Sequence, residues 1–413
     1  MHAEVIAFGD ELTTGQRLDT NSQWLSQRLG DLGVHVHFHS TVGDQLEDCT
    51  QAFRIAVQRA DIVITTGGIG PTADDLTRNA LAAATDRPLE LNELVWKHIQ
   101  ALFRRRGRVI PERNRVQAMF PGGSQEIKNP NGTAPGIYMS VDRPDRPAAH
   151  IFVLPGVPAE MREMWSDSLE QRLAELLGPQ RNLILHQRIK CFGAGESELE
   201  QMLPGVTERG RSPSVGITVH RATITLRVTA QGKTAEECRT TMRPTIDLIH
   251  QCLGPLIFGE EDDELQDAVL RLLGKRQQTL ATVEIATKGL VAKWLATASS
   301  ASTLYLGGKV IPGEVWQAET EESDLPSAID ITARVADMAR KVQMEFQADY
   351  GLAIGPVPTS PVGSGSPPRI HLALATDRDV RQESKPFASH PDIRLSLAAK
   401  HALNLIRLTL ADQ

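Results

Sequence analysis

One stretch, residues 62–77, constrains this chain more than any other. It reads I-V-I-T-T-G-G-I-G-P-T-A-D-D-L-T. The apolar and β-branched residues at its start are typical of a short, buried strand in a parallel sheet. A glycine-rich turn comes next, and Asp74 and Asp75 then stand at the start of a helical pattern that continues through Ala80 and Leu81. The stretch therefore predicts a buried strand, a glycine turn and a helix, in that order.

The glycine turn also suggests a chemistry. Glycines between a buried strand and a helix allow main-chain N–H groups to approach a phosphate closely, with the positive end of the helix dipole behind them. Asp74 and Asp75 would repel that phosphate unless a divalent cation lay between the charges. The stretch therefore favours phosphate binding combined with a metal. The alternative is ordinary helix capping, because Asp is common at a helix start and a single glycine-rich loop is a weak sign of function.

Two earlier strands also end in carboxylates. Residues 4–8 are a candidate strand that leads to Asp10 and Glu11, and residues 34–39 are a second that leads to Asp44. The alternation of strands with amphipathic helices predicts a parallel sheet with right-handed crossovers and helices on both faces. The carboxyl ends of such strands meet at the edge where open α/β folds place ligands. We therefore expect these carboxylates and those of the glycine-rich stretch to converge on one site.

Three histidines alternate along the second candidate strand, at His35, His37 and His39. Alternate residues of a strand share one face of the sheet, which is an arrangement that can bind a metal. No acidic or cysteine partner follows at the spacing of metal ligands, so the favoured interpretation is a solvated strand face.

Composition excludes several classes of protein. The chain has 413 residues, and at about 150 residues per domain this predicts two or three domains. Its net charge of −7 argues against a protein that coats nucleic acid. The start lacks a secretory signal pattern, and no apolar run approaches the length of a membrane span, so a cytoplasmic location is expected. The four cysteines show no C-x-x-C spacing, which argues against a zinc ribbon.

Five motifs in the first part of the chain carry a family resemblance. They are G-D-E-L, V-G-D, T-G-G-I-G-P-T-A-D-D-L-T, N-P-N-G-T-A-P-G and L-P-G-V-P-A-E-M. In this order and spacing they resemble the amino-terminal domain of the CinA family, the competence- and damage-inducible proteins. That domain is similar to the molybdopterin-binding fold of molybdenum-cofactor biosynthesis enzymes. In CinA proteins it is associated with ADP-ribose pyrophosphatase activity that depends on a divalent metal.

The resemblance agrees with the residue pattern and implies a site. A pyrophosphatase must neutralise the charge of the scissile P–O–P group while water attacks, and a divalent cation held by carboxylates does this. We expect Co²⁺, Mn²⁺ or Mg²⁺ as the cation. The expected catalytic residues are Asp44, Asp74 and Asp75; the expected metal ligands are Asp10, Glu11, Asp44 and Asp75; the expected phosphate-binding residues are Gly67, Gly68, Gly70, Thr72 and Thr77.

The expected fold is α/β and multidomain. A parallel-sheet, molybdopterin-binding-like domain occupies residues 1–175, a small α+β domain residues 176–259, and an α/β domain of the CinA carboxy-terminal type residues 260–413. Alternating strands at 214–218 and 222–229 predict an antiparallel sheet in the middle domain. This domain carries no recognisable chemistry, so we expect it to act as a spacer or a dimer contact within a homodimer.

The last domain resembles the carboxy-terminal domain of the CinA family, which in active members deamidates nicotinamide mononucleotide. Its catalytic motifs are altered here. The nucleophile motif E-S-C-T-G-G appears as E-I-A-T-K-G, so that Ile285 stands where the serine should be. Isoleucine has no oxygen with which to attack an amide. Pro312 and Gln317 replace a tyrosine and a lysine, and the T-G-I-A-G-P-G-G turn is reduced to G-P-V-P-T-S at 355–360. We expect an inactive domain kept for packing or assembly, in preference to a new use of Thr287 or Lys288.

The leading hypothesis is therefore a metal-dependent hydrolase of nucleotide pyrophosphates such as ADP-ribose. One alternative is a non-catalytic scaffold that binds a nucleotide or a pterin phosphate. An active nicotinamide-mononucleotide amidohydrolase is disfavoured by Ile285. The expected partner is a small nucleotide, with no nucleic acid or membrane.

Overall fold

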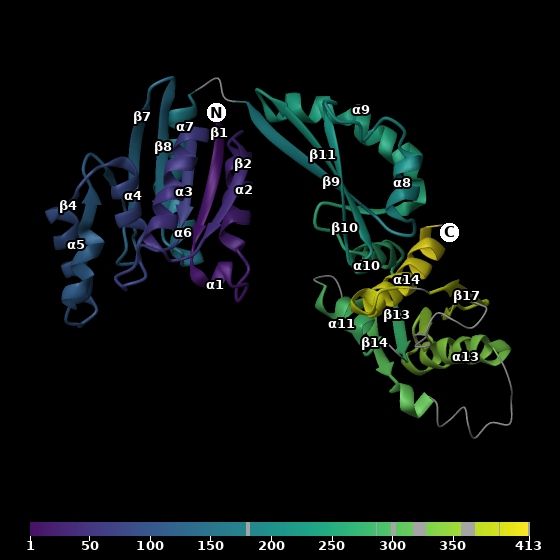
Figure 1. Ribbon diagram of the computed structural model, residues 1–413. Coiled ribbons are helices and arrows are strands. Elements are labelled where there is room, and N and C mark those ends of the chain that lie inside the picture. The colour runs from purple at the N-terminus through teal and green to yellow at the C-terminus, as the bar shows by residue number, and fades with distance from the viewer. Residues whose placement is uncertain are drawn as a thin grey trace. The chain divides into compact units, whose positions relative to one another are not determined.

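The computed structural model describes residues 1–178, 182–285, 287–298, 303–316, 328–356, 368–387 and 389–411. The chain divides into two compact units (Figure 1). Met1–Leu185 and Gln231–Thr240 form the first unit, while His186–Ala230 and Thr241–Gln413 form the second.

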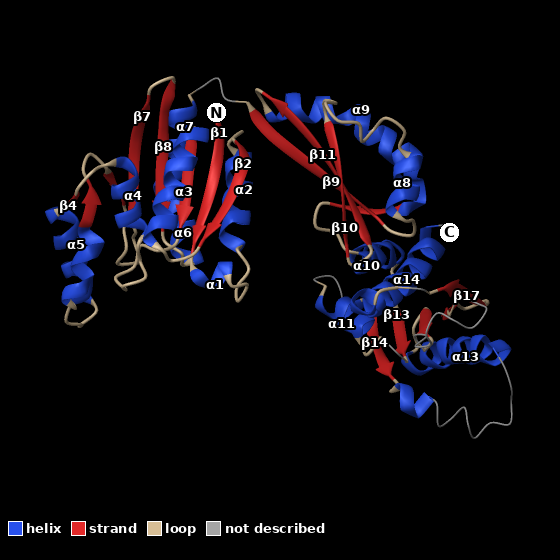
Figure 2. Ribbon diagram, viewed as in Figure 1, coloured by secondary structure: helices blue, strands red, loops and turns tan. Residues whose placement is uncertain are grey.

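A six-stranded sheet is the centre of the first unit (Figure 2). Its strand order is β2-β1-β3-β8-β7-β6, in which the first four strands are parallel and β7 and β6 are antiparallel additions. The strands are β1 (His2–Phe8), β2 (His35–Val42), β3 (Ile62–Thr66), β6 (Gln125–Ile127), β7 (Gly136–Arg143) and β8 (Arg146–Leu154). The predicted buried strand at residue 62 is confirmed, since every residue of β3 is buried.

Helices cover both faces of this sheet, because its central strands are apolar on both sides. Ile6 and Val63 pack with Phe53 in one core cluster, whereas Val5 and Ile64 belong to another. The first cluster is covered by α3 (Leu46–Arg59), α4 (Thr77–Thr85) and α5 (Glu93–Arg105); the second by α2 (Thr20–Asp31), α6 (Pro158–Met164) and α7 (Glu170–Leu177). The expected parallel-sheet domain with helices on both faces is thus confirmed.

Shorter elements complete the first unit. They are α1 (Asp10–Thr13), the two-stranded sheet of β4 (Leu89–Leu91) and β5 (Met119–Pro121), the 3-10 helix Glu112–Ala118, and a π-helical segment, Trp165–Leu169, between α6 and α7.

A second sheet has the strand order β10-β11-β9-β12. Its strands are β9 (Leu183–Cys191), β10 (Ser214–His220), β11 (Thr223–Gly232) and β12 (Ile257–Glu260), and its helices are α8 (Glu196–Met202) and α9 (Ala235–Leu253). The pairs β10–β11 and β12–β9 are antiparallel. The alternating strands predicted in this region are therefore confirmed.

The third sheet has the order β14-β13-β15-β16-β17. It comprises β13 (Leu280–Glu284), β14 (Tyr305–Val310), β15 (Tyr350–Ile354), β16 (Arg369–Ala375) and β17 (Val380–Pro386), with helices α10 (Leu265–Arg276), α11 (Leu290–Thr297), α13 (Ala328–Phe346) and α14 (Pro391–Ala411). β13 pairs in parallel with β14 and β15, and β16 pairs antiparallel with both β15 and β17. Among the described residues, no helix has the length and apolar character of a membrane span.

An ion pair between a buried carboxylate and a partly exposed arginine links β1, β2 and α3. Glu4 on β1 is 1% exposed and accepts hydrogen bonds from Nε and Nη2 of Arg59 on α3, at 2.8 and 2.6 Å. Ser40 on β2 donates a third, at 2.6 Å. The carboxylate is therefore paired, and its burial depends on Arg59.

We predict that Arg59→Met destabilises the first unit by about 3 kcal/mol, because it leaves the Glu4 charge buried without its partner. Hydrogen exchange of β1 and β3 peptides under native conditions measures this change. The double variant Glu4→Gln with Arg59→Met should recover part of the loss, since a neutral amide replaces the buried charge. Equal protection in wild type and Arg59→Met would contradict the prediction.

Candidate functional site

The glycine turn follows β3 at the carboxyl edge of the six-stranded sheet. Gly67 and Gly68 have φ angles of 101° and 65°, which residues with side chains rarely adopt. A Cβ atom on Gly67 would lie 2.4 Å from the carbonyl oxygen of Phe8, and one on Gly68 would lie 2.2 Å from Oγ1 of Thr77. The turn itself therefore requires glycine at both positions, whatever it binds.

Two residues of α4 fix the carbonyl groups of this turn. The Thr77 hydroxyl donates to the carbonyl oxygen of Gly67 at 2.9 Å, so its proton is already used within the protein. Arg78 is 2% exposed and donates to the carbonyl oxygens of Ile69 and Gly70. Burial lowers the pKa of Arg78 to about 10, against the opposing charge of Asp75, so the guanidinium stays charged at neutral pH. Sequence reasoning missed Arg78, whose only signal is a charge within an apolar helical pattern.

Asp75 occupies the main-chain amides that the sequence assigned to phosphate. Its carboxylate accepts hydrogen bonds from the N–H groups of Gly70 at 2.7 Å and Thr72 at 2.8 Å, and also from the Thr72 hydroxyl. The carboxylate of Asp75 thus acts as an internal anion for this turn. For this reason α4 begins at Thr77, two residues later than the expected start of the helical pattern.

Asp10 and Asp44 join the loops that follow β1 and β2. The Asp10 amide donates to Oδ2 of Asp44 at 3.0 Å, and the Asp44 amide donates to Oδ1 of Asp10 at 2.9 Å. Burial raises the pKa of Asp44, the hydrogen bond from the Asp10 amide opposes this, and the charges of Asp10, Asp74 and Glu11 raise it further. Carboxylates from three different loops therefore lie within electrostatic range of one another, as expected.

A pocket of about 540 Å³ opens beside these groups. Glu11, Asp44, Asp74 and Asp75 line it together with the turn at 67–71. Thr72, Thr77 and Asp10 are predicted residues that are not among the lining residues. The hydroxyls of Thr72 and Thr77 donate hydrogen bonds to Asp75 and to the carbonyl oxygen of Gly67, and the Asp10 carboxylate accepts one from the Asp44 amide. The pocket therefore gathers most of the predicted acidic residues around the glycine turn.

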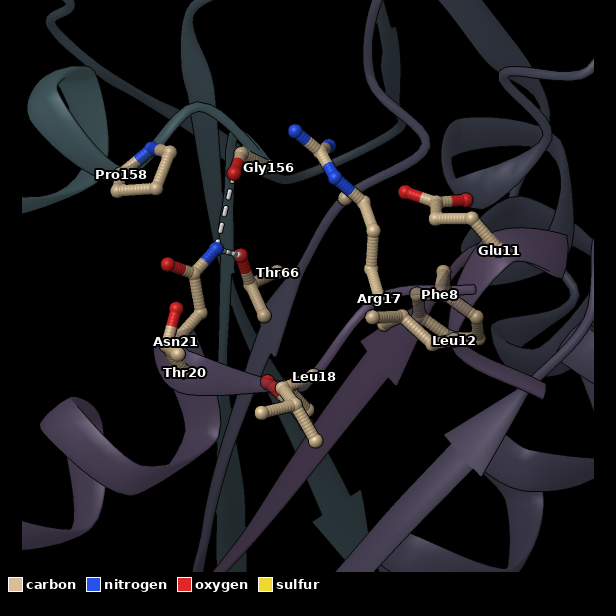
Figure 3. Close-up of a pocket in the computed structure, with 12 residues that line it drawn as sticks. Phe8, Glu11, Leu12, Arg17, Leu18, Thr20, Asn21, Thr66, Gly156 and Pro158 are labelled. Atoms are coloured by element: carbon tan, nitrogen blue, oxygen red, sulfur yellow. Dashed lines mark hydrogen bonds between the residues drawn. The ribbon is translucent and has the colours of Figure 1, made fainter. Parts of the chain in front are cut away.

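A smaller pocket of about 170 Å³ adjoins the first and shares Arg17, Glu11 and Gly156 with it (Figure 3). Asn21 forms one side, where its Nδ2 donates to Oγ1 of Thr66 at 3.0 Å and to the carbonyl oxygen of Gly156 at 2.9 Å. Arg17 extends along the other side, beside Glu11 (Figure 3). The Arg17 amide donates to the carbonyl oxygen of Glu11 at 2.9 Å. Because the Arg17 guanidinium has no hydrogen bond or ion pair to any residue of the described chain, it is available to an anion. Sequence reasoning also missed this arginine, which stands in the loop after G-D-E-L.

The donor set is suited to a hard cation that is shared with a ligand. Within the described part of the chain, no group of three or more His, Cys, Asp or Glu side chains is placed to hold a metal ion. The pocket nevertheless presents oxygen donors from Glu11, Asp44 and Asp74. Mg²⁺ is commonly bound by one or two carboxylates, with water and substrate phosphates completing its shell. These residues therefore fit a cation that binds together with a phosphate compound.

The three histidines of β2 are exposed on the strand. His37 stacks on His2 with 4.7 Å between ring centroids, and Nε2 of His39 lies 2.7 Å from Oγ of Ser26. This arrangement agrees with the favoured interpretation of a polar strand face.

The altered nucleophile motif lies at the end of β13. Ile285 is 2% exposed, so the serine position is filled by a buried apolar side chain. Glu284 is fully buried, and its carboxylate accepts hydrogen bonds from the Thr287 hydroxyl at 2.5 Å and from the amides of Val291 and Ala292 at 3.2 and 2.8 Å. Glu284 and Thr287 therefore hold the start of α11.

Other positions of the altered motifs differ in how far they are described. Lys288 is exposed and has no partner among the described residues, as expected for a solvated lysine. Gln317 and residues 357–360 lie outside the described chain.

Comparison with known families places three matches along the chain. Residues 4–175 match the "Probable molybdopterin binding domain", residues 186–259 the "Damage-inducible protein CinA KH domain", and residues 262–410 the "CinA C-terminal domain".

Individual relatives match over nearly the full length. A CinA-like protein of Synechococcus sp. (strain CC9902) is 36% identical over 381 residues, which cover 90% of this chain and 89% of the relative. A CinA-like protein of Frankia casuarinae is 33% identical over 430 residues, which cover 100% of this chain and 96% of the relative. A crystal structure of CinA from Thermoplasma acidophilum is 30% identical, covers 41% of this chain and 96% of its own, and has a TM-score of 0.37. The chain therefore belongs to the CinA family, with a molybdopterin-binding-like domain, a CinA KH domain and a CinA carboxy-terminal domain.

Proposed function

We propose that the N-terminal domain hydrolyses a nucleotide pyrophosphate of the ADP-ribose type with the help of Co²⁺, Mn²⁺ or Mg²⁺. The observation that carries the proposal is the 540 Å³ pocket, where carboxylates from separate loops meet a glycine turn. Carboxylates repel a phosphate ligand unless a cation lies between them, so their presence here favours metal-assisted chemistry over simple anion binding.

Each residue of the pocket has a role in this proposal. Glu11 and Asp74 would hold the cation, which when bound neutralises phosphate charge and lowers the pKa of water. The guanidinium of Arg17 binds a phosphate oxygen. Asp44, whose pKa is raised, accepts a proton from the attacking water. Asp75 keeps the turn in shape through the amides of Gly70 and Thr72. Water adds to one phosphorus, the P–O–P bond breaks, and ADP-ribose gives AMP and ribose 5-phosphate.

One observation favours a second candidate, a non-catalytic scaffold that binds a nucleotide or a pterin phosphate. The described residues hold no cluster of three metal ligands, and Asp75 already fills the amides of the turn. A binder of this kind would hold the phosphate through the Arg17 guanidinium and would need no metal cation. Turnover that depends on a metal distinguishes the two functions.

The proposal extends to the rest of the chain. The carboxy-terminal domain lacks deamidase activity, because Ile285 is buried and apolar where a nucleophile is needed, and it serves packing or assembly. We place the protein in the cytoplasm as a homodimer, as the sequence led us to expect.

We predict that the full chain converts ADP-ribose to AMP in the presence of Co²⁺, Mn²⁺ or Mg²⁺ and loses this activity in EDTA. Asp44→Asn should lower kcat by about 100-fold or more, because the amide cannot accept the proton. Asp142→Asn is the matched control, since Asp142 is an exposed carboxylate on β7 with no described partner. Chromatography of AMP measures the rate. Binding of ADP-ribose without any turnover would instead support the scaffold.

We also predict that Asp44→Asn leaves the first unit as stable as wild type, or more stable, at pH 7. The raised pKa means that folded Asp44 binds a proton more readily than unfolded Asp44 does. Stability therefore falls as pH rises from the ordinary value of 3.8 through the raised pKa, and the cost is fully present above that range. The asparagine removes this cost and still accepts the hydrogen bond from Asp10. Thermal unfolding should show a larger advantage at pH 7 than at pH 4, and the opposite order would contradict the prediction.

For the last domain, we predict that the wild-type chain releases no ammonia from nicotinamide mononucleotide. Ile285→Ser should not restore the reaction, because Pro312 and Gln317 also replace catalytic positions of the family motif. A coupled ammonia assay measures both proteins. Turnover by the wild-type chain would refute the assignment of an inactive domain.

A further inference from the structure

A cavity of about 210 Å³ lies in the second unit, and none of its described lining residues belongs to the altered deamidase motifs. Its described lining residues come from the β10–β11 hairpin, from β9, and from α10 with its N-cap, α11 and α14. The charged groups that line it are Lys190, Arg221, Lys400 and Glu264, and the Trp294 side chain borders them. The cavity is smaller than the usual site for a drug-sized ligand, so it suits a small molecule.

The charges of this cavity do not balance. Lys190 and Glu264 form an ion pair with 2.9 Å between Nζ and Oε1. That pair uses the only carboxylate among the described lining residues. Lys400 and Arg221 therefore contribute two positive charges that no further acidic residue of the described lining neutralises.

Lys400 is the least exposed of these cations, at 6%. Its ammonium group has three donors, and the hydroxyl of Thr223 is the one hydrogen-bond acceptor that the described residues offer it. Burial lowers the pKa of Lys400. The charge of Glu264 opposes this shift, and the charges of Lys190 and Arg221 lower the pKa further. A buried ammonium with unused donors is costly, and an anionic ligand would satisfy it.

Arg221 is exposed at the mouth of the cavity and has no hydrogen bond or ion pair to any described residue. It and Ala222 form the two-residue turn of the β10–β11 hairpin, with φ angles of 46° and 65°. Turns of this type usually carry Asn or Gly, because side chains disfavour positive φ. The arginine is thus held in a strained turn at a position where its guanidinium can reach a ligand.

We propose that this cavity binds a dianionic phosphate group, either free or carried by a small phosphate monoester. The ammonium of Lys400 at the base and the guanidinium of Arg221 at the mouth would donate charge-assisted hydrogen bonds to its oxygens. Trp294 offers an apolar surface to the ester substituent. The positive charges of this site come from lysine and arginine side chains, so phosphate binding here needs no metal. It also does not depend on the proposed hydrolase.

Calorimetry of the full chain in EDTA tests the proposal with inorganic phosphate, ribose 5-phosphate and ribose at constant ionic strength. We expect both phosphate compounds to bind and ribose not to bind. Tighter binding of ribose 5-phosphate identifies a monoester site, whereas equal affinities identify a site for free phosphate. Absence of phosphate binding, or equal binding of ribose, overturns the proposal.

Variants of the lining residues test whether the binding measured by calorimetry takes place in this cavity. Arg221→Ala and Lys400→Met should each weaken phosphate binding by about tenfold or more, since each removes a charge-assisted hydrogen bond. Arg227→Ala is the control, because Arg227 is an exposed, unpaired arginine of the same hairpin outside the cavity lining. Arg17→Met alters the N-terminal pocket and should leave this binding unchanged. If Lys400→Met does not fold, Arg221→Ala alone decides, and wild-type affinity in Arg221→Ala overturns the proposal.

Discussion

The N-terminal domain depends on the close approach of backbone to backbone at the end of β3. Gly67 lies so near Phe8 that no side chain fits between them, and this contact brings the ends of β1 and β3 together. The loops that follow these strands, and the loop after β2, therefore open at one edge of the sheet. The resulting crowding of carboxylates is visible in Asp44, whose pKa is raised by burial and by its acidic neighbours. A pocket with this much negative charge favours a cation when it binds phosphate.

The fold of this domain follows closely from the sequence because its signals are local. The five buried residues of β3 and the alternation of strands with amphipathic helices predicted a parallel sheet with two covered faces, which the structure confirms. The carboxylates were expected at one edge from strand order alone, and Glu11, Asp44 and Asp74 do line one pocket. Topology therefore predicted which loops meet.

Hydrogen-bond partners could not be predicted in the same way, since they depend on side-chain directions. Asp75 and Thr77 have the residue types of ligand-binding groups, yet the structure shows them bonded to the backbone of the turn. Arg78 stabilises the same turn from inside the core, where a sequence pattern predicts an apolar residue. Arg17 was missed for the opposite reason, because a single arginine in a loop is ordinary until a pocket is seen around it.

The second unit shows how a domain can keep its packing after its nucleophile motif has changed. Glu284 remains buried because it binds the amides at the start of α11, and this role is independent of the residue at position 285. Selection for folding would preserve Glu284 even without catalysis. Lys400 differs in this respect. A buried ammonium bonded to one hydroxyl is costly, and an apolar side chain in its place would stabilise the packing better. A costly charge that packing does not require is best explained by a ligand.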